Sequence, residues 1–311
     1  MSTATVAPST VDAEEPGDRP VFKRNRKPIR PARIVLYVFL TVVALGWLAP
    51  LLLAVYASVR PYQETAKYGY FSWPHKLSLD YYKQAWSGAD LPHYFRNTFV
   101  ITVPAVVLTL FLASFVAFAL SRFAIPGRTM LLVMFTAGNL LPPQVIVTPL
   151  YTAYTKIPLP EWMSSSLSLY DSYIGLVAIH VAFQTGFCVF VLYNYMRTIP
   201  VELNEAALVD GAGVWRQYWQ VILPLTRPAL GALATLEFTF IYNDFLWALV
   251  LMSSGDKLPV TSALNNLRGQ FFTDYNLLAA GSVLVALPTL IVFFALQKQF
   301  VSGLTLGANK G

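Results

Sequence analysis

The chain has 311 residues, of which 56% are hydrophobic and only 12% are charged. An average soluble domain is about one quarter charged, so these proportions exclude an ordinary water-soluble fold and indicate a protein surrounded mostly by lipid. The formal net charge is +6. No basic patch with interleaved aromatic residues lies in a soluble segment large enough to fold alone, so nucleic acid is not an expected partner. The single cysteine, Cys188, excludes an internal disulfide.

Residues 1–33, which precede the first apolar run, are rich in Pro, Ser, Thr and charge and predict a disordered basic cytoplasmic tail. The run that follows is too long for a cleaved signal peptide. With the N-terminus in the cytoplasm, 14 of the 22 Lys and Arg residues lie on the inner side, as the positive-inside rule requires. We therefore expect both termini in the cytoplasm and a transmembrane domain over residues 34–311.

Six apolar runs are long enough to cross a bilayer, because a helix needs roughly 20 apolar residues to span the hydrocarbon core. They do not alternate apolar and polar residues as barrel strands do, so the sequence predicts an all-α polytopic membrane protein with six transmembrane helices. Only one of them contains Asp, Glu, Lys or Arg. In chain order the runs cover residues 34–58, 98–120, 130–151, 174–193, 229–252 and 277–297.

The usual sequence signs of catalysis are missing. The sequence has no phosphate-binding G-x-x-x-x-G-K-[ST] loop, no H-E-x-x-H motif, no cysteine pair with zinc spacing and no G-x-S-x-G motif. We therefore expect no catalytic residue, no metal site and no cofactor on this chain. His180 and Gln184 are four residues apart on one helix face, and we expect an interhelical hydrogen bond there.

A polar segment, residues 197–227, separates the fourth and fifth runs and would face the cytoplasm. Glu205 lies early in a helical pattern, where the helix dipole favours negative charge. Gly211 indicates a bend, and a second helical pattern runs to Leu223 and Pro224, where proline is expected to end it. The sequence thus predicts a helix, a bend and a second helix. Its simplest role is to reverse the chain between two spans.

The same segment resembles the signature of permease subunits of binding-protein-dependent ABC importers. That signature is E-A-A, three residues, Gly, nine residues, an aliphatic residue, any residue and Leu-Pro. Here it falls on Glu205, Ala206, Ala207, Gly211, Val221, Leu223 and Pro224, with Val221 in place of the usual isoleucine. The segments "SLDYYKQAW", "LPPQVIVTPLY", "YNDFLWALV" and "FVSGLTLGANKG" resemble the carbohydrate branch of the family, the maltose-type permeases with six spans.

The resemblance implies a type I ABC importer permease that translocates a sugar or oligosaccharide across the inner membrane. It implies three kinds of protein partner: a second permease subunit, two ATPase subunits and an extracytoplasmic sugar-binding protein. ATP and Mg would bind the ATPases, each of which grips an EAA coupling loop, here residues 197–227. The permease itself is then not an enzyme. The C-terminal "GLTLGANKG" would lie near the ATPases.

The run at 229–252 contains Glu237 and Asp244, seven residues apart and therefore expected on one helix face. Charges at membrane depth are costly and usually functional. We expect Glu237, Asn243 and Asp244 to line the translocation path or to bond to neighbouring helices. The alternative function is an ion-coupled secondary transporter that uses Glu237 and Asp244, and a scaffold without a path is a third hypothesis. The many aromatic residues of 59–97 are expected at the membrane interface or against a delivered binding protein.

Overall fold

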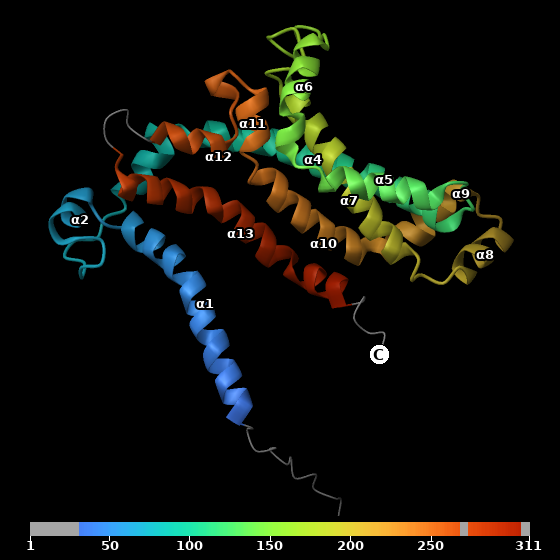
Figure 1. Ribbon diagram of the computed structural model, residues 1–311, viewed down its shortest axis with the longest axis horizontal. Coiled ribbons are helices and arrows are strands. Elements are labelled where there is room, and N and C mark those ends of the chain that lie inside the picture. Colours follow the sequence, from blue (N-terminus) through green and yellow to red (C-terminus); the bar gives the residue numbers. More distant parts are fainter. Residues whose placement is uncertain (1–30, 268–272, 306–311) are drawn as a thin grey trace, which may run out of the picture. The chain divides into compact units, whose positions relative to one another are not determined.

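The computed structural model describes residues 31–267 and 273–305 (Figure 1). Within these ranges the chain is helical and pairs no strands beyond one isolated bridge between Pro158 and Ser168, which confirms the all-α class. The predicted tail lies outside the described residues up to position 30, and α1 already begins at Pro31. The last residues of the C-terminal segment, 306–311, lie outside them as well.

The longest connection between the helices runs over residues 157–172 and joins α6 to α7. Two π-helical turns, η1 and η2, and two 3-10 turns, η3 and η4, are inserted among them. The bounds are α1 Pro31–Ser58, α2 Tyr62–Tyr68, α3 Asp80–Lys83, η1 Gln84–Gly88, α4 Leu91–Arg122, α5 Arg128–Leu140, α6 Pro143–Lys156, α7 Tyr173–Met196, α8 Glu202–Val209, α9 Val214–Arg216, η2 Gln217–Ile222, α10 Leu223–Tyr242, α11 Leu246–Leu251, η3 Gly255–Lys257, α12 Val260–Ala263, η4 Leu264–Leu267 and α13 Tyr275–Thr305.

Among the described residues, five helical stretches are long and apolar enough to cross a membrane: Pro31–Ser58, Leu91–Arg122, Tyr173–Met196, Val214–Tyr242 and Tyr275–Gln297. A sixth candidate is the pair α5 and α6, which is bent by 93°. The bend falls where Pro142 and Pro143 follow Leu141, because proline lacks the backbone donor that would continue α5. The predicted third span, 130–151, is therefore broken rather than continuous.

The predicted fifth span, 229–252, is displaced in the structure. The helix begins earlier, at Val214, and ends at Tyr242. Asn243 and Asp244 interrupt it, and α11 starts again at Leu246. Glu237 and Asp244 consequently do not share a helix face, and that part of the sequence interpretation is wrong.

The first unit of the chain, residues up to Pro50, contains most of α1. The apolar side chains of this helix are exposed all round, and none of its most hydrophobic window is buried. A helix that is apolar on every side suits a lipid environment.

The second unit, from Leu51 onward, is built around α4, α7, α10 and α13. The helix α4 packs along α7, and α10 packs along α13 and against α4 and α7. Small residues allow the close contacts, as is usual between membrane helices: Ala113, Ala117 and Cys188 are fully buried in the core shared by α4, α7 and α10. Gly186 lets α5 approach α7, since a Cβ there would lie 2.3 Å from the Phe135 carbonyl oxygen.

Two loops at one end of α7 are joined by a buried carboxylate. Asp171 precedes α7 and accepts hydrogen bonds from the backbone N–H groups of Ser253 and Ser254, both at 2.9 Å. The Ser254 hydroxyl also donates to it, and Lys257 Nζ lies 3.2 Å from Asp171 Oδ2. Asn97 of α4 holds the same strip of chain by donating to the carbonyls of Asp256 and Leu258. The loop after α11 is thus fixed from two sides.

Candidate functional site

The segment after α7 leaves the membrane helices at a point that α4 fixes. Arg122, in the last turn of α4, donates from Nη2 to the Met196 carbonyl at 2.9 Å and from Nη1 to the Ile199 carbonyl at 3.1 Å. Met196 is the last residue of α7, and a cation near the last carbonyls of a helix stabilises that helix end. Sequence reasoning missed Arg122, because its partners lie more than seventy positions away.

The helix α8 carries the first part of the E-A-A pattern. Glu202 and Glu205 lie in its first turn, where they complement the helix dipole. Every residue of α8 is at least partly exposed, including Leu208 at 66% and Val209 at 87%. An exposed surface that combines apolar side chains with carboxylates is typical of a protein contact site.

The bend after α8 is built as the glycine pattern predicts. Gly211 has φ +78°, a conformation in which glycine carries no steric penalty. The Ala212 N–H closes the turn on the Ala207 carbonyl at 2.8 Å. Gln217 then joins both sides of the bend: its Nε2 donates to the Ala212 carbonyl at 2.9 Å, and its Oε1 accepts from Asn204 Nδ2 at 3.1 Å. The segment is therefore a fixed shape and not a slack linker.

Aromatic residues fasten this bend to α4. Tyr218 is 1% exposed and stacks on Phe115 with ring centroids 4.4 Å apart. Its hydroxyl lies 2.7 Å from that of Ser114. Trp215 stacks on the same Phe115 at 5.4 Å. A displacement of α8 and α9 would therefore move α4 as well, because packed side chains are not easily compressed.

The second helix of the segment does not end at Leu223 and Pro224, contrary to the expectation from sequence. It continues without interruption from α9 through η2 into α10. The η2 turn is π-helical, and the Leu223 N–H bonds to the Tyr218 carbonyl, five residues back. This wider turn accommodates Pro224, whose ring would otherwise crowd the carbonyl four positions earlier. A π turn inserted in a membrane helix often marks a functional position.

Glu237 and Asp244 occupy two separate environments. Glu237 is fully buried between α7 and α10, where Cys188 Sγ donates to its Oε1 at 3.2 Å. Asp244 lies past the end of α10 and accepts from the N–H groups of Trp247 and Ala248 at 3.3 and 3.2 Å, so it caps α11. Asn243 is exposed and donates to the Thr239 carbonyl at 2.8 Å. The assignment of these residues to the translocation path stays a prediction.

His180 approaches Asp244 and not a residue of its own helix face. Its Nε2 lies 3.7 Å from Asp244 Oδ2, which is longer than a hydrogen bond. The cavity beside this pair, which Thr98 and Thr102 of α4 also line, measures about 10 Å³. That volume has room for about one water molecule, so it cannot hold a sugar ring. The cavity next to Asp244 is therefore too small for a sugar, and Glu237 does not line it.

These features define a polytopic helical membrane protein in which a rigid, exposed two-helix segment links two spans and is locked to a third. Residues 97–305 match the family of binding-protein-dependent transport system inner membrane components, and the chain belongs to this family. The resemblance noted in the sequence is confirmed, and the family carries no support for an ion-coupled transporter acting alone.

Individual relatives agree with this membership. The chain is 30% identical over 264 residues to a probable ABC transporter permease of Pyrococcus horikoshii, covering 84% of this chain and 92% of the relative. It is 31% identical over 239 residues to the diacetylchitobiose uptake system permease of Streptomyces coelicolor, covering 76% of each. Its fold matches a solved bacterial ABC transporter involved in alginate import, with a TM-score of 0.73 and 24% identity, covering 86% of this chain and 96% of the other.

Proposed function

We propose that this chain is the membrane-spanning permease subunit of an ATP-driven importer that translocates a sugar or oligosaccharide delivered by a solute-binding protein. The carbohydrate assignment is supported by the relatives, one of which takes up diacetylchitobiose and another of which is involved in alginate import. It is also supported by the segments that resemble the carbohydrate branch. The proposal includes a second permease subunit beside this one.

The observation that carries the proposal is the exposed face of α8 held in a fixed bend. Glu205, Ala206 and Ala207 form a helix surface with little side-chain bulk beside one charge, and Leu208 and Val209 are exposed next to it. Two ATPase subunits, which would hold ATP and Mg, dock there on the cytoplasmic side. Each grips one such segment, so ATPase activity resides on the partner.

The geometry supplies a route from that contact to the membrane helices. When the ATPases close on ATP, they push α8, and the bend at Gly211 transmits the push because Gln217 spans it. Tyr218 and Phe115 carry the displacement into α4, while the continuous helix through Leu223 and Pro224 carries it into α10. Both helices line the core of the membrane unit, so the same motion can reopen the path on the outer side.

The proposal is tested by uptake into vesicles that contain the chain with its co-expressed subunits and the binding protein. We expect the vesicles to accumulate saccharide only when both ATP and the binding protein are present. Accumulation should persist when ionophores collapse the proton and sodium gradients. Uptake that follows an ion gradient and ignores ATP would overturn the proposal. A panel of labelled saccharides, each tested first for binding to the solute-binding protein, identifies the sugar.

A further inference from the structure

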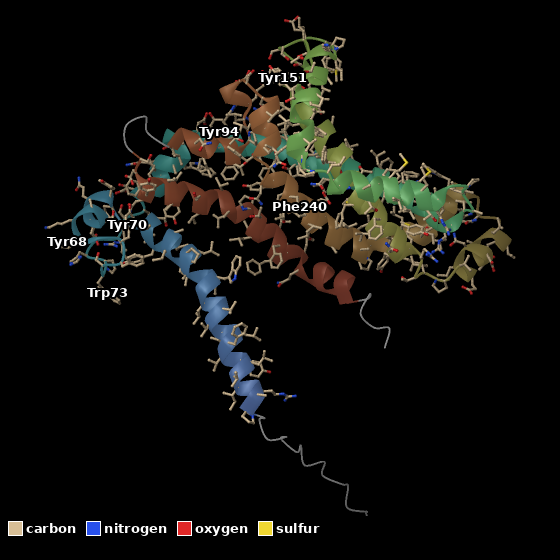
Figure 2. All side chains as sticks on the ribbon, in the orientation of Figure 1. Tyr68, Tyr70, Trp73, Tyr94, Tyr151 and Phe240 are labelled. Carbon is tan, nitrogen blue, oxygen red and sulfur yellow. The ribbon has the colours of Figure 1, made fainter. Side chains whose placement is uncertain are left out.

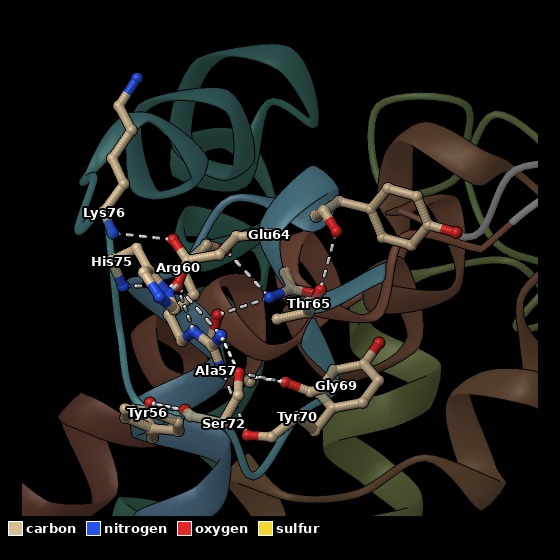
Figure 3. Close-up of polar contacts among 12 residues, drawn as sticks. Tyr56, Ala57, Arg60, Glu64, Thr65, Gly69, Tyr70, Ser72, His75 and Lys76 are labelled. Atoms are coloured by element: carbon tan, nitrogen blue, oxygen red, sulfur yellow. Dashed lines mark hydrogen bonds and ion pairs between the residues drawn. The ribbon is translucent and has the colours of Figure 1, made fainter. Parts of the chain in front are cut away.

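The chain between α1 and α3 folds around the buried guanidinium group of Arg60 (Figure 3). We call residues 59–79 the Arg60 segment. Arg60 is fully buried, and its Nη2 and Nε donate to Glu64 Oε1 at 3.0 and 3.3 Å. Its Nη1 donates to the carbonyls of Gly69 and Tyr70 at 3.3 and 3.1 Å, and Nη2 also reaches the Ser72 hydroxyl at 2.8 Å. One guanidinium thus closes a loop of more than ten residues.

Glu64 holds the other half of the loop. Its two carboxylate oxygens accept the backbone N–H groups of His75 and Lys76, each at 2.8 Å. The hydrogen bond from the His75 N–H is the largest cause that lowers the pKa of Glu64 below its ordinary value, and Arg60 adds to the effect. The carboxylate is therefore ionised at neutral pH, and the buried pair has nearly all its hydrogen-bonding positions filled. A loop held in this way presents its outer side chains in a fixed arrangement.

The Arg60 segment is also fixed against the end of α1. The Tyr56 hydroxyl, in the last turns of α1, donates to the Ser72 carbonyl. Asn276 of α13 donates to the carbonyls of Ala57 and Arg60 at 3.0 and 2.9 Å and accepts from the Thr65 hydroxyl. The position of Ser72 along the helix axis is thereby set at the level of Tyr56.

Large apolar side chains project from this compact loop. Trp73 is 87% exposed and Phe71 is 85% exposed, while the Ser72 between them turns inward to Arg60. Figure 2 shows Trp73 at the rim of the segment, next to the C-terminal turns of α1. Leu77 and Leu79 are also mostly exposed. Lys67 and Lys76 lie on the same segment and are exposed as well.

We propose that Phe71 and Trp73 insert into the headgroup region of the phospholipid bilayer, so that the Arg60 segment is a membrane-interface anchor that sets the depth of the end of α1. α1 has 28 residues, which at 1.5 Å per residue exceed the roughly 30 Å hydrocarbon core. Its last turn therefore reaches the headgroups, and the bond from Tyr56 to Ser72 puts the neighbouring Trp73 at that level.

Chemistry at this level favours lipid as the occupant. Indole rings concentrate at the membrane interface, where an apolar body meets a polar edge. Lys67 and Lys76 can extend their ammonium groups to lipid phosphates. The Arg60 segment also directly follows α1, a candidate span, in the chain. The anchor depends on the chain being a membrane protein and not on the proposed import of sugar, so the two can fail separately.

The test uses nitroxide labels on the full-length chain, purified with its own subunits and placed in lipid nanodiscs. Labels go on Trp73→Cys and Phe71→Cys, with Gln63→Cys on the exposed face of α2 as the matched control. The native Cys188 is fully buried and is not expected to react. Collision rates with oxygen, which concentrates in lipid, are compared with those for a water-soluble nickel chelate.

Expected is an oxygen-to-nickel accessibility ratio several-fold higher at positions 71 and 73 than at position 63. The same label at 73 in an Arg60→Gln background should lose most of this preference, because the loop is no longer closed. The proposal is overturned if position 73 favours the nickel chelate, which means water. It is overturned equally if position 73 is shielded from both agents, which means that protein and not lipid covers it.

Discussion

The hydroxyl groups of Tyr218 and Ser114 lie 2.7 Å apart, and this contact joins the segment that follows α7 to the C-terminal third of α4. Tyr218 belongs to the η2 turn, while Ser114 also donates to the Phe111 carbonyl of its own helix at 2.8 Å. The pair is therefore more than a surface contact: it is part of the stacked aromatic group through which α9 rests on α4.

Truncation of Tyr218 should separate ATP hydrolysis from transport. Tyr218→Ala removes a buried ring and is expected to cost about 3–5 kcal/mol of stability. Tyr218→Phe keeps the stack and loses one hydrogen bond, for about 0.5–1.5 kcal/mol, since Ser114 retains its bond to Phe111. Thermal unfolding in detergent measures both values. We expect Tyr218→Ala, which loses the stack on Phe115, to assemble with the ATPases and keep hydrolysis while sugar uptake falls, and we expect Tyr218→Phe to keep most of the uptake. Equal loss of both activities would contradict a transmitting role.

Gly211 offers a test of the docking surface with a matched pair of substitutions. Gly211→Asn and Gly211→Asp place side chains of the same shape in the same positive-φ position, which asparagine and aspartate tolerate better than other residues. A Cβ there meets no atom within 4 Å, so the pair differs mainly in charge. We expect Gly211→Asp to lose ATPase co-purification and uptake, because an unpaired charge in a protein contact costs several kcal/mol.

The same measurements on Gly211→Asn and Glu205→Ala complete the comparison. Both should retain most ATPase binding, with Glu205→Ala mildly impaired because a charged partner is removed without a new clash. Membrane insertion should be normal in all three variants. If Gly211→Asp binds the ATPase and transports normally, the segment merely reverses the chain between two spans.

Glu237 distinguishes an ATP-driven from an ion-coupled mechanism. Glu237→Gln keeps an oxygen to accept the hydrogen bond from Cys188 and removes the ionisable group. We expect uptake within about twofold of the unchanged protein, because the residue is enclosed between α7 and α10 and acts through packing. Glu237→Ala, which leaves a cavity, is the control and should lower thermal stability. Complete loss of uptake in a stable Glu237→Gln protein would revive the ion-coupled hypothesis.

Ionised Asp171 is expected to stabilise the folded protein at neutral pH and to lose this contribution in acid. Burial alone raises the pKa of Asp171, but the hydrogen bonds from Ser254, Ser253 and Lys257 outweigh burial and hold it below the ordinary value of 3.8. A depressed pKa in the folded state stabilises the protein above the unfolded-state value, and this contribution is lost as pH falls through the folded value. The unfolding temperature should thus be insensitive to Asp171 between about pH 5 and 8 and should fall below about pH 4.

Asp171→Asn is the companion variant. It should be less stable than the unchanged protein at pH 7, and the difference should shrink in acid. Asparagine fits the backbone, since Asp171 has φ +54° and asparagine adopts this left-handed region more readily than most residues. A difference that is constant from pH 7 to pH 3 would show that the carboxylate charge contributes nothing.

Cysteine labelling checks the orientation on which the docking proposal depends. Trp162, between α6 and α7, is 83% exposed, and Gly213 lies in the α8–α9 bend. Trp162→Cys should react with an impermeant maleimide in intact cells, and Gly213→Cys should react only after permeabilisation. The buried Cys188 provides a low background. The reverse pattern would put the E-A-A segment outside the cell and remove the basis for ATPase docking.

Much of this architecture can be predicted from local sequence. Apolar runs locate the spans because every backbone polar group within lipid must be bonded inside its own helix. Gly211 marks its bend because a positive φ favours glycine. The E-A-A pattern correctly locates an exposed helix, α8.

The parts that could not be predicted depend on partners distant in sequence. Arg122 and Gln217 carry no local signal, since an arginine after a span and a glutamine in a polar loop are ordinary. Pro224 suggested a helix end because the rule that proline ends a helix holds for α-helical geometry. The preceding turn, η2, is π-helical, so the rule does not apply there. The expectation that Glu237 and Asp244 share a helix face was wrong for a related reason. A spacing of seven residues places two side chains on one face only if the helix is continuous between them.

The π turn at Gln217–Ile222 has one further effect, on angular phase. Successive residues of an α-helix are rotated by about 100°, and a π turn takes up one additional residue. A helical wheel drawn continuously from Val214 to Tyr242 therefore mis-orients one half against the other by about that angle. Deleting a single residue within the turn would restore a regular helix and rotate Trp215 away from Phe115. The alignment of α8 and α9 with α10 thus depends on one residue of length rather than on any particular side chain.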